Sequence, residues 1–307
     1  MHMSRWLAAL VLGLGLAIAA TAQDKITLKV NYEPGTYLLT HQTQADTTTS
    51  GYKATLKSAM TLVAQMEIAK ADDKGNREVK FTYKRVKTDM RSGDSKYTYD
   101  SAVGGNETIG PWPANKILGA MIDKTLTMTL DSKGRVSNIK GTDEMVDAMV
   151  KDAGLPEAVS AELKKQYGQK KIEELFSIMH MFPDKPVAKG DKWDITKKMR
   201  DGATDFTQTY TLKDIKDKMA IIAFTGTLKM ATTASGPAGQ TVTMKQMNDV
   251  SGTSQVNIDT GMVKQMDMTL KGSGTSGNES TFTFDMKVAL TIEKGTYKAP
   301  TTTKAAQ

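Results

Sequence analysis

The chain has 307 residues, no cysteine, and 41 Lys and Arg against 34 Asp and Glu, which gives a formal charge of +7 at pH 7. The absence of cysteine excludes disulfides, thiol catalysis and the attachment of lipid to a cysteine. The lysines are spread along the chain and often alternate with Thr, Asp or Glu, as on the solvent face of strands. We therefore expect a fold that rests on a packed core and no nucleic-acid partner.

The first element in chain order is an N-terminal leader. Residues 1–5 carry one positive charge, residues 6–20 are apolar without interruption, and Ala20 and Ala22 place small residues at a cleavage site. This pattern predicts a secretory signal peptide over residues 1–22, cleaved after Ala22. The mature chain would then begin at Gln23, where a lipoprotein would carry Cys, and would be periplasmic or secreted. No other stretch approaches the ~20 apolar residues that span a bilayer.

Residues 23–141 form an N-terminal half in which apolar and polar residues alternate, as in antiparallel strands with one dry face. Asp72 to Asn76 contains Gly75 between two such runs and predicts a hairpin turn. The expected strands include 26–30, 60–68, 79–84 and 126–130.

Residues 142–182 have helical spacing instead and predict an insert of three short amphipathic helices. Thr142 is the expected N-cap of the first helix, with Asp143 and Glu144 in its first turn, and Gly154 is its expected end. The second helix would follow Pro156, and the third would end near Pro183.

Residues 183–297 return to the alternating pattern and predict a C-terminal antiparallel β half. Segments 231–241 and 271–280 are rich in Ser, Gly and Thr and predict hairpin loops, and residues 298–307 predict a disordered tail. Further strands are expected at 206–213, 220–230, 255–258, 263–270 and 281–292.

The fold class is therefore mainly β (α+β), and two arrangements cover its dry faces. The two halves can form one antiparallel curved sheet with the helices across its concave side, or two packed β units joined by the helices. Turn motifs at 131–136 and 259–263 recur after a strand in each half, which leaves an internal duplication open.

Several turn and strand-opening motifs carry a resemblance to an uncharacterised family of exported bacterial proteins, a domain of unknown function. This family resemblance implies no activity and no catalytic residue. The single-sheet arrangement also resembles exported lipoprotein carriers, which hold acyl chains between a half-barrel and helices. The residues that carry the family resemblance are Pro34, Gly35, Pro186, Gly190, Trp193, Asp259 and Gly261.

Catalytic chemistry has little support in the sequence. Only His41 and His180 follow the leader, and no G-x-S-x-G motif occurs. We interpret His41 as a solvent-facing strand residue. The acidic pairs Asp72/Asp73 and Asp143/Glu144 fit a turn and a helix start. We therefore expect no enzyme activity and no cofactor.

One minor alternative is copper, because Met179, His180 and Met181 place thioether and imidazole ligands together, and such ligands suit Cu(I). Consecutive helix residues point about 100° apart, however, so the three side chains converge poorly on one ion. Two further methionine pairs, Met145/Met149 and Met244/Met247, also place thioether groups close together in the sequence.

Two functional hypotheses follow. The first is an exported binding protein whose methionine-rich interior holds a lipid or another hydrophobic ligand. The alternative is a structural or interaction protein of the envelope that works through its surface.

Overall fold

The structure is a computed structural model that describes residues 25–50, 55–103, 114–154, 164, 168–169, 172–173, 181–198, 204–235, 241–276 and 280–300. The expected signal peptide, its cleavage site and Gln23 lie outside the described residues.

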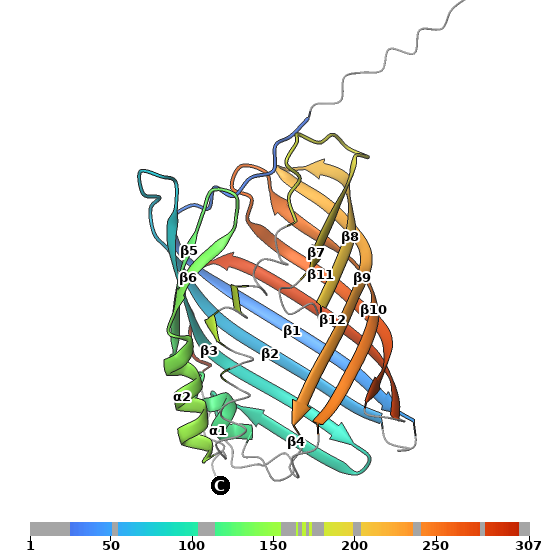
Figure 1. Ribbon diagram of the computed structural model, residues 1–307. Coiled ribbons are helices and arrows are strands. Elements are labelled where there is room, and N and C mark those ends of the chain that lie inside the picture. Colours follow the sequence, from blue (N-terminus) through green and yellow to red (C-terminus); the bar gives the residue numbers. More distant parts are fainter. Residues whose placement is uncertain are drawn as a thin grey trace, which may run out of the picture.

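One antiparallel sheet of 12 strands dominates the described chain (Figure 1). Its order is β6-β5-β3-β2-β1-β12-β11-β10-β9-β8-β7, and β4 pairs with β3 beside this path. The strands are β1 Gly35–Thr49, β2 Thr55–Ile68, β3 Arg77–Ser92, β4 Ser95–Asp100, β5 Thr125–Leu130, β6 Val136–Lys140, β7 Lys192–Lys198, β8 Thr204–Lys216, β9 Met219–Ser235, β10 Thr241–Asn257, β11 Val263–Ser276 and β12 Ser280–Lys294.

Pairing of β1 with β12 joins the two halves, over a register that runs from Tyr37 opposite Lys294 to Thr49 opposite Phe282. The expectation of one curved antiparallel sheet is therefore confirmed, and the alternative of two packed β units is wrong. Figure 1 shows the sheet wrapping around a concave interior, with β6 and β7 as its edges.

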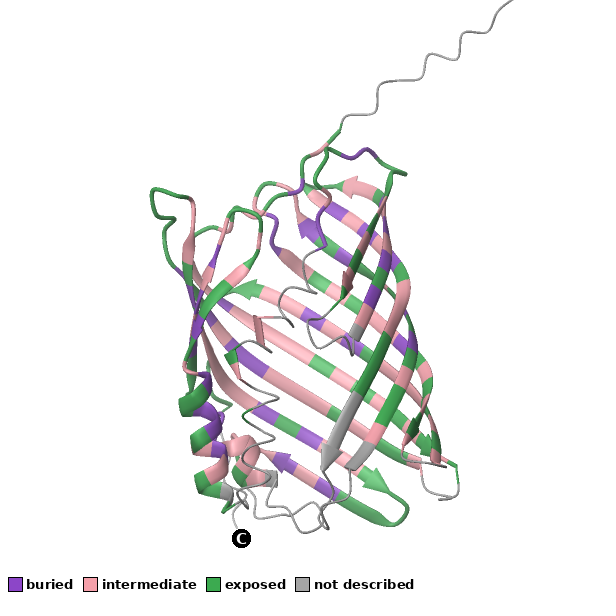
Figure 2. Ribbon diagram, in the orientation of Figure 1, coloured by how far each residue is buried: buried purple, intermediate pink, exposed green. Residues whose placement is uncertain are grey.

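The strands form because their side chains alternate between the two faces of the sheet. In β1, Leu39, His41 and Thr43 are half-buried, while Gln42 and Gln44 are exposed. The same alternation of buried and exposed positions runs along most strands in Figure 2. It places the apolar residues on the concave face and Thr, Lys, Gln and Asp on the convex face.

Two expected hairpin loops are largely strand. β9 extends to Ser235 and β11 to Ser276, so most of 231–241 and 271–280 is paired. Their Ser, Thr and Gly residues are the ends of long strands, because cross-strand hydrogen bonds do not depend on side-chain hydrophobicity. The expected strand at 26–30 is also wrong, since only an isolated bridge joins Ile26 to Val187 there.

The turn at Asp72 is built as expected. Gly75 has φ 81°, and the Asp72 carboxylate accepts the backbone N–H groups of Lys74 and Asn76 at 2.9 and 2.8 Å. These hydrogen bonds hold the pKa of Asp72 below its usual value, with those from Asn76 as the main cause. Asp131 accepts the amides of Lys133 and Arg135 in the same way.

The described residues contain two short helices, α1 Ala114–Gly119 and α2 Thr142–Ala153. The three-helix insert is therefore confirmed only in its first member, α2, and most of the rest of 142–182 lies outside the described residues. α1 was not expected. Gly154 ends α2 in the left-handed conformation, as predicted.

The expected N-cap of α2 is wrong, because Gly141 holds that position with φ 90° and Thr142 is the first helical residue. Asp143 and Glu144 do lie in the first turn. A side chain at Gly141 would overlap the Thr125 carbonyl of β5, so the close approach of α2 to the sheet requires glycine there.

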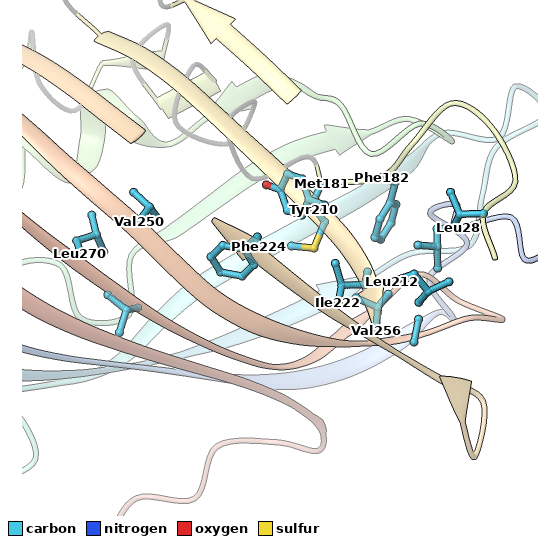
Figure 3. Packing of buried hydrophobic residues seen from close by; sticks show 13 residues of the cluster. Leu28, Met181, Phe182, Tyr210, Leu212, Ile222, Phe224, Val250, Val256 and Leu270 are labelled. Carbon is cyan, nitrogen blue, oxygen red and sulfur yellow. The ribbon is translucent and has the colours of Figure 1, made fainter. Parts of the chain in front are cut away.

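Two apolar clusters fill most of the concave side. One lies over β7–β12, and Figure 3 shows its residues, including Met181, Tyr210 and Phe224. The other lies over β1–β3 and β5, where Met145 and Met149 of α2 pack against Leu126 and Ile139.

Candidate functional site

An apolar cavity of about 480 Å³ lies on the concave face, between the two clusters. Its wall includes residues of ten strands, β1, β2, β3, β5, β6 and β8–β12. Seven methionines line it: Met66, Met128, Met181, Met262, Met266, Met268 and Met286. Methionine side chains are flexible and polarizable, so this wall can adapt to an apolar ligand of irregular shape.

The segments that precede β1 and β7 add to the cavity wall. Val30 and Tyr32 come from the chain that precedes β1, and Met181 and Phe182 come from the chain that precedes β7. The N-terminal segment is tied to the sheet by the Asn31 amide, which donates to the Thr260 carbonyl at 2.8 Å. Sequence reasoning assigned residues 26–30 to a strand, and thus missed that this segment covers the interior.

The polar groups on the cavity wall are few. Gln208 is 4% exposed, and its Oε1 accepts the hydroxyl of Tyr210. Burial raises the pKa of Tyr32 to about 12, so its hydroxyl keeps its proton at neutral pH. Thr43 is the next inward residue of β1 after His41.

His41 lines the cavity, so its interpretation as a solvent-facing residue is wrong. It lies between Leu62 of β2 and Leu290 of β12 in the sheet register. Burial lowers the pKa of His41 below its usual value, which favours the neutral imidazole. A signal was present in the sequence, because Tyr37, Leu39 and His41 share one face of the alternating pattern.

An aromatic row lies near β7, and two of its members, Tyr210 and Phe224, line the cavity. Trp193 stacks on Tyr210 with ring centroids 5.6 Å apart and an interplanar angle of 11°, and Tyr210 lies 5.8 Å from Phe224. Trp193 Nε1 donates to the carbonyl of Met181 at 2.8 Å. The row therefore joins the segment before β7 to the sheet.

Inward-facing glycines make room for this wall. Gly252 of β10 pairs with Phe224, and a Cβ at Gly252 would lie 2.5 Å from the Phe224 ring. Gly226 of β9 pairs with Gln208, whose Cγ would lie 2.8 Å from an added Cβ. Each large side chain thus lies across the backbone of the adjacent strand, which only glycine permits.

The motif residues of the family resemblance occupy turns and strand starts. Gly35 begins β1 with φ 148°, Gly190 precedes β7 with φ 92°, and Gly261 turns the chain between β10 and β11 with φ 69°. A side chain at Gly261 would overlap the Lys29 carbonyl. Asp259 forms an ion pair with Lys218 at 2.9 Å. Pro34 and Pro186 lie beside these turns, and only Trp193 of the set contributes to the aromatic row.

The described residues provide no geometric support for a copper site. Met179 and His180 lie outside the described residues, while Met181 is 8% exposed within an apolar cluster. Met145 and Met149 belong to α2 and are buried in the core against the sheet. Met244 and Met247 are three positions apart on β10 and so point to opposite faces. No group of three His, Asp or Glu side chains that could hold a metal occurs among the described residues.

The fold and the cavity define a class: an open antiparallel sheet that curves around an apolar interior. The chain belongs to DUF6263, a family of unknown function, whose sequence profile matches residues 74–264. This confirms the resemblance to an uncharacterised domain.

No curated protein matches the sequence. Among solved structures, a lipovitellin structure described by its lipid–protein interactions is similar over 90% of this chain, at 11% identity and a TM-score of 0.48. The chain spans 27% of that lipovitellin chain. An outer-membrane channel from Pseudomonas putida F1 is similar over 87% of this chain and 98% of its own, at 8% identity and a TM-score of 0.27. These likenesses are too remote to assign a shared function.

None of the helices in the described ranges is long and apolar enough to cross a membrane.

Proposed function

We propose that this protein is an exported, non-enzymatic binding protein that holds the hydrocarbon part of a lipid or similar ligand in the concave cavity. The observation that carries the proposal is the cavity itself, whose wall is apolar and rich in methionine. Pockets for small ligands are concave, largely apolar and provided with a few polar groups.

The size of the cavity suits one hydrocarbon chain. A water molecule occupies about 30 Å³ of liquid and a methylene group a similar volume, so about 480 Å³ accommodates an acyl chain of ordinary length. Transfer of each methylene from water contributes about 0.8 kcal/mol. An acyl chain of ten buried methylenes would gain roughly 8 kcal/mol before the cost of ordering.

Binding without catalysis is favoured by the composition of the wall. None of the described residues that line the cavity is Asp or Glu, so His41 has no carboxylate partner there. The lowered pKa of His41 has burial as its cause rather than a charged neighbour. This environment suits an apolar guest better than acid–base chemistry.

Export is part of the proposal and is supported by the leader at residues 1–22. N-terminal sequencing of the protein from its native envelope is expected to begin at Gln23, or to be blocked by cyclisation of that residue. A chain from the membrane fraction that still begins at Met1 would contradict export.

Ligand binding is tested first by native mass spectrometry of the protein purified from its own envelope, where a co-purifying lipid is expected. The second test uses diphenylhexatriene, a neutral apolar fluorophore, on delipidated protein. Met268→Trp adds volume inside the cavity and is expected to weaken probe binding about tenfold, from the loss of one to two kcal/mol of contact. Thr269→Trp, on the convex face, is the matched control and should bind like the wild type.

Two results would overturn the proposal: an apo mass from native spectrometry together with no probe binding, or probe binding that Met268→Trp leaves unchanged. The first result would favour the alternative of an envelope protein that works through its surface.

A further inference from the structure

Lys197 departs from the pattern of its strand. In β7 the inward positions are Trp193, Ile195 and Lys197, which are half-buried, while Lys198 and the other outward positions are exposed. Lys197 pairs with Phe206 of β8, which is 6% exposed and lines the cavity. The sheet therefore directs the side chain of Lys197 to its concave side, next to the apolar cavity.

The surroundings of Lys197 disfavour its charge. Burial lowers the pKa of its ammonium group, and no neighbouring charge contributes to the shift. In the described part of the chain, the ammonium group of Lys197 makes no ion pair or hydrogen bond. No carboxylate is available among the described residues that line the cavity either.

The other lysine beside the interior differs in this respect. Lys264 of β11 places its Nζ 6.0 Å from the centre of the Tyr37 ring, which gives it a cation–π partner. Among the described residues, Lys197 is thus a half-buried cation without a charged partner, and it lies on an edge strand, where an anionic group could remain in contact with water. An unpaired half-buried cation is costly unless an anion binds beside it.

We propose that the ligand is a single-chain amphiphile with an anionic head group, carboxylate or phosphate, whose chain occupies the cavity and whose head group pairs with Lys197. This inference rests on the proposed function, since it requires an apolar guest in the cavity. Pairing of an ammonium group with a carboxylate or phosphate is among the stronger hydrogen-bonded interactions in proteins.

The test measures displacement of diphenylhexatriene from delipidated full-length protein by three ligands: hexadecanoate, monohexadecyl phosphate and hexadecanol. Because the three share one hydrocarbon chain, any difference in affinity comes from the head group. The wild type is expected to bind the anions about tenfold or more tightly than the alcohol. The tighter of the two anions identifies the head group as carboxylate or phosphate.

Lys197→Met keeps an unbranched side chain and removes the charge. It should weaken both anions about tenfold and leave hexadecanol unchanged, while Lys197→Arg should retain the preference for anions. Lys198→Met, on the outward side of the same strand, is the matched control and should behave like the wild type. Circular dichroism melting establishes that each variant folds.

The head-group assignment is overturned if hexadecanol binds as tightly as the anions, or if Lys197→Met leaves anion affinity unchanged while diphenylhexatriene still binds. Such a result would assign Lys197 to protection of an edge strand against pairing with other chains. Failure of the wild type to bind diphenylhexatriene would instead overturn the proposed function, and this assignment with it.

Discussion

The two halves of the sheet fill their concave sides in different ways. In the N-terminal half, α2 supplies the cover, and Met145 and Met149, which are 1% and 2% exposed, pack on Leu126 and Ile139. In the C-terminal half, β7, β8 and β9 fill the space from the sheet itself through Trp193, Tyr210 and Phe224.

This difference explains where the cavity lies. A helix covers only the strands that it reaches, and large side chains can lie flat only where the adjacent strand carries glycine, as at Gly226 and Gly252. The strands between these regions, β1, β12 and β11, carry medium-sized inward side chains such as Leu290, Val288 and Met268, and the cavity remains above them. In the described part of the chain, the cavity is the space that is filled neither by α2 nor by the large side chains of β7, β8 and β9.

The largest effect is expected in the helix-covered half. Met149→Ala removes a fully buried side chain and leaves a cavity under α2, which should lower the free energy of unfolding by about 3 kcal/mol. Urea denaturation measures the loss, and Lys151→Ala, at an exposed position of the same helix, should change it little. An unchanged midpoint for Met149→Ala would mean that α2 does not stabilise the sheet.

The next largest effect is expected in the C-terminal half, where Gly252 is the position to change. Gly252→Ala places a Cβ against the Asp267 carbonyl of β11 and 2.5 Å from the Phe224 ring, and the forced shift should cost about 2 kcal/mol. The exposed neighbour Ser251→Ala is the control. In a double-mutant cycle, Gly252→Ala should cost less when Phe224 is already Leu, because the contact with the ring is then lost while the contact with the Asp267 carbonyl remains. Simple additivity of the two changes would contradict a direct contact.

A smaller effect is expected for Trp193→Phe. This change keeps a ring that can stack on Tyr210 but removes the hydrogen bond to the Met181 carbonyl. The free energy of unfolding should fall by about 1 kcal/mol, measured by the same denaturation. A much larger loss would show that the indole packs more of the core than its polar contact indicates.

The smallest effect is expected at His41 and depends on pH. Burial places the pKa of His41 in the folded chain below its ordinary value of 6.5, so the unfolded chain binds a proton more readily. Stability should therefore decrease as the pH falls below 6.5, through the interval down to the folded pKa. His41→Leu should make the melting temperature less dependent on pH over that interval. An equally steep dependence in the variant would assign it to other groups.

Local features of the fold were predictable where a residue type strongly favours one backbone conformation or one face of a strand. The turn at Asp72 to Asn76, the end of α2 at Gly154 and most strand positions follow from the sequence, because turn glycines and alternating side chains act over a few residues. The strand ends rich in Ser and Thr, and the N-cap of α2, were predicted wrongly. Pairing with a neighbouring strand and the approach to Thr125 decided these, and neither is visible in the local pattern of apolar and polar residues.

The candidate site was predictable only in its chemical character. Methionine-rich apolar faces indicated an apolar interior, but His41 was assigned to the solvent face although it shares one face of the alternation with Tyr37 and Leu39. The same applies to Lys197, which differs from Lys198 only by its place in the alternation of β7.

By itself, the sequence of this protein determined an alternating antiparallel framework with sharp turns and no cross-links, since these depend on neighbouring residues and on the absence of cysteine. Only the tertiary structure decided that β1 pairs with β12 and that one face of this sheet is concave. The pairing joins residues more than 230 positions apart, as with Ser50 and Thr281. Which face becomes the interior depends on the curvature of all the strands together, and the cavity exists only after that curvature is set.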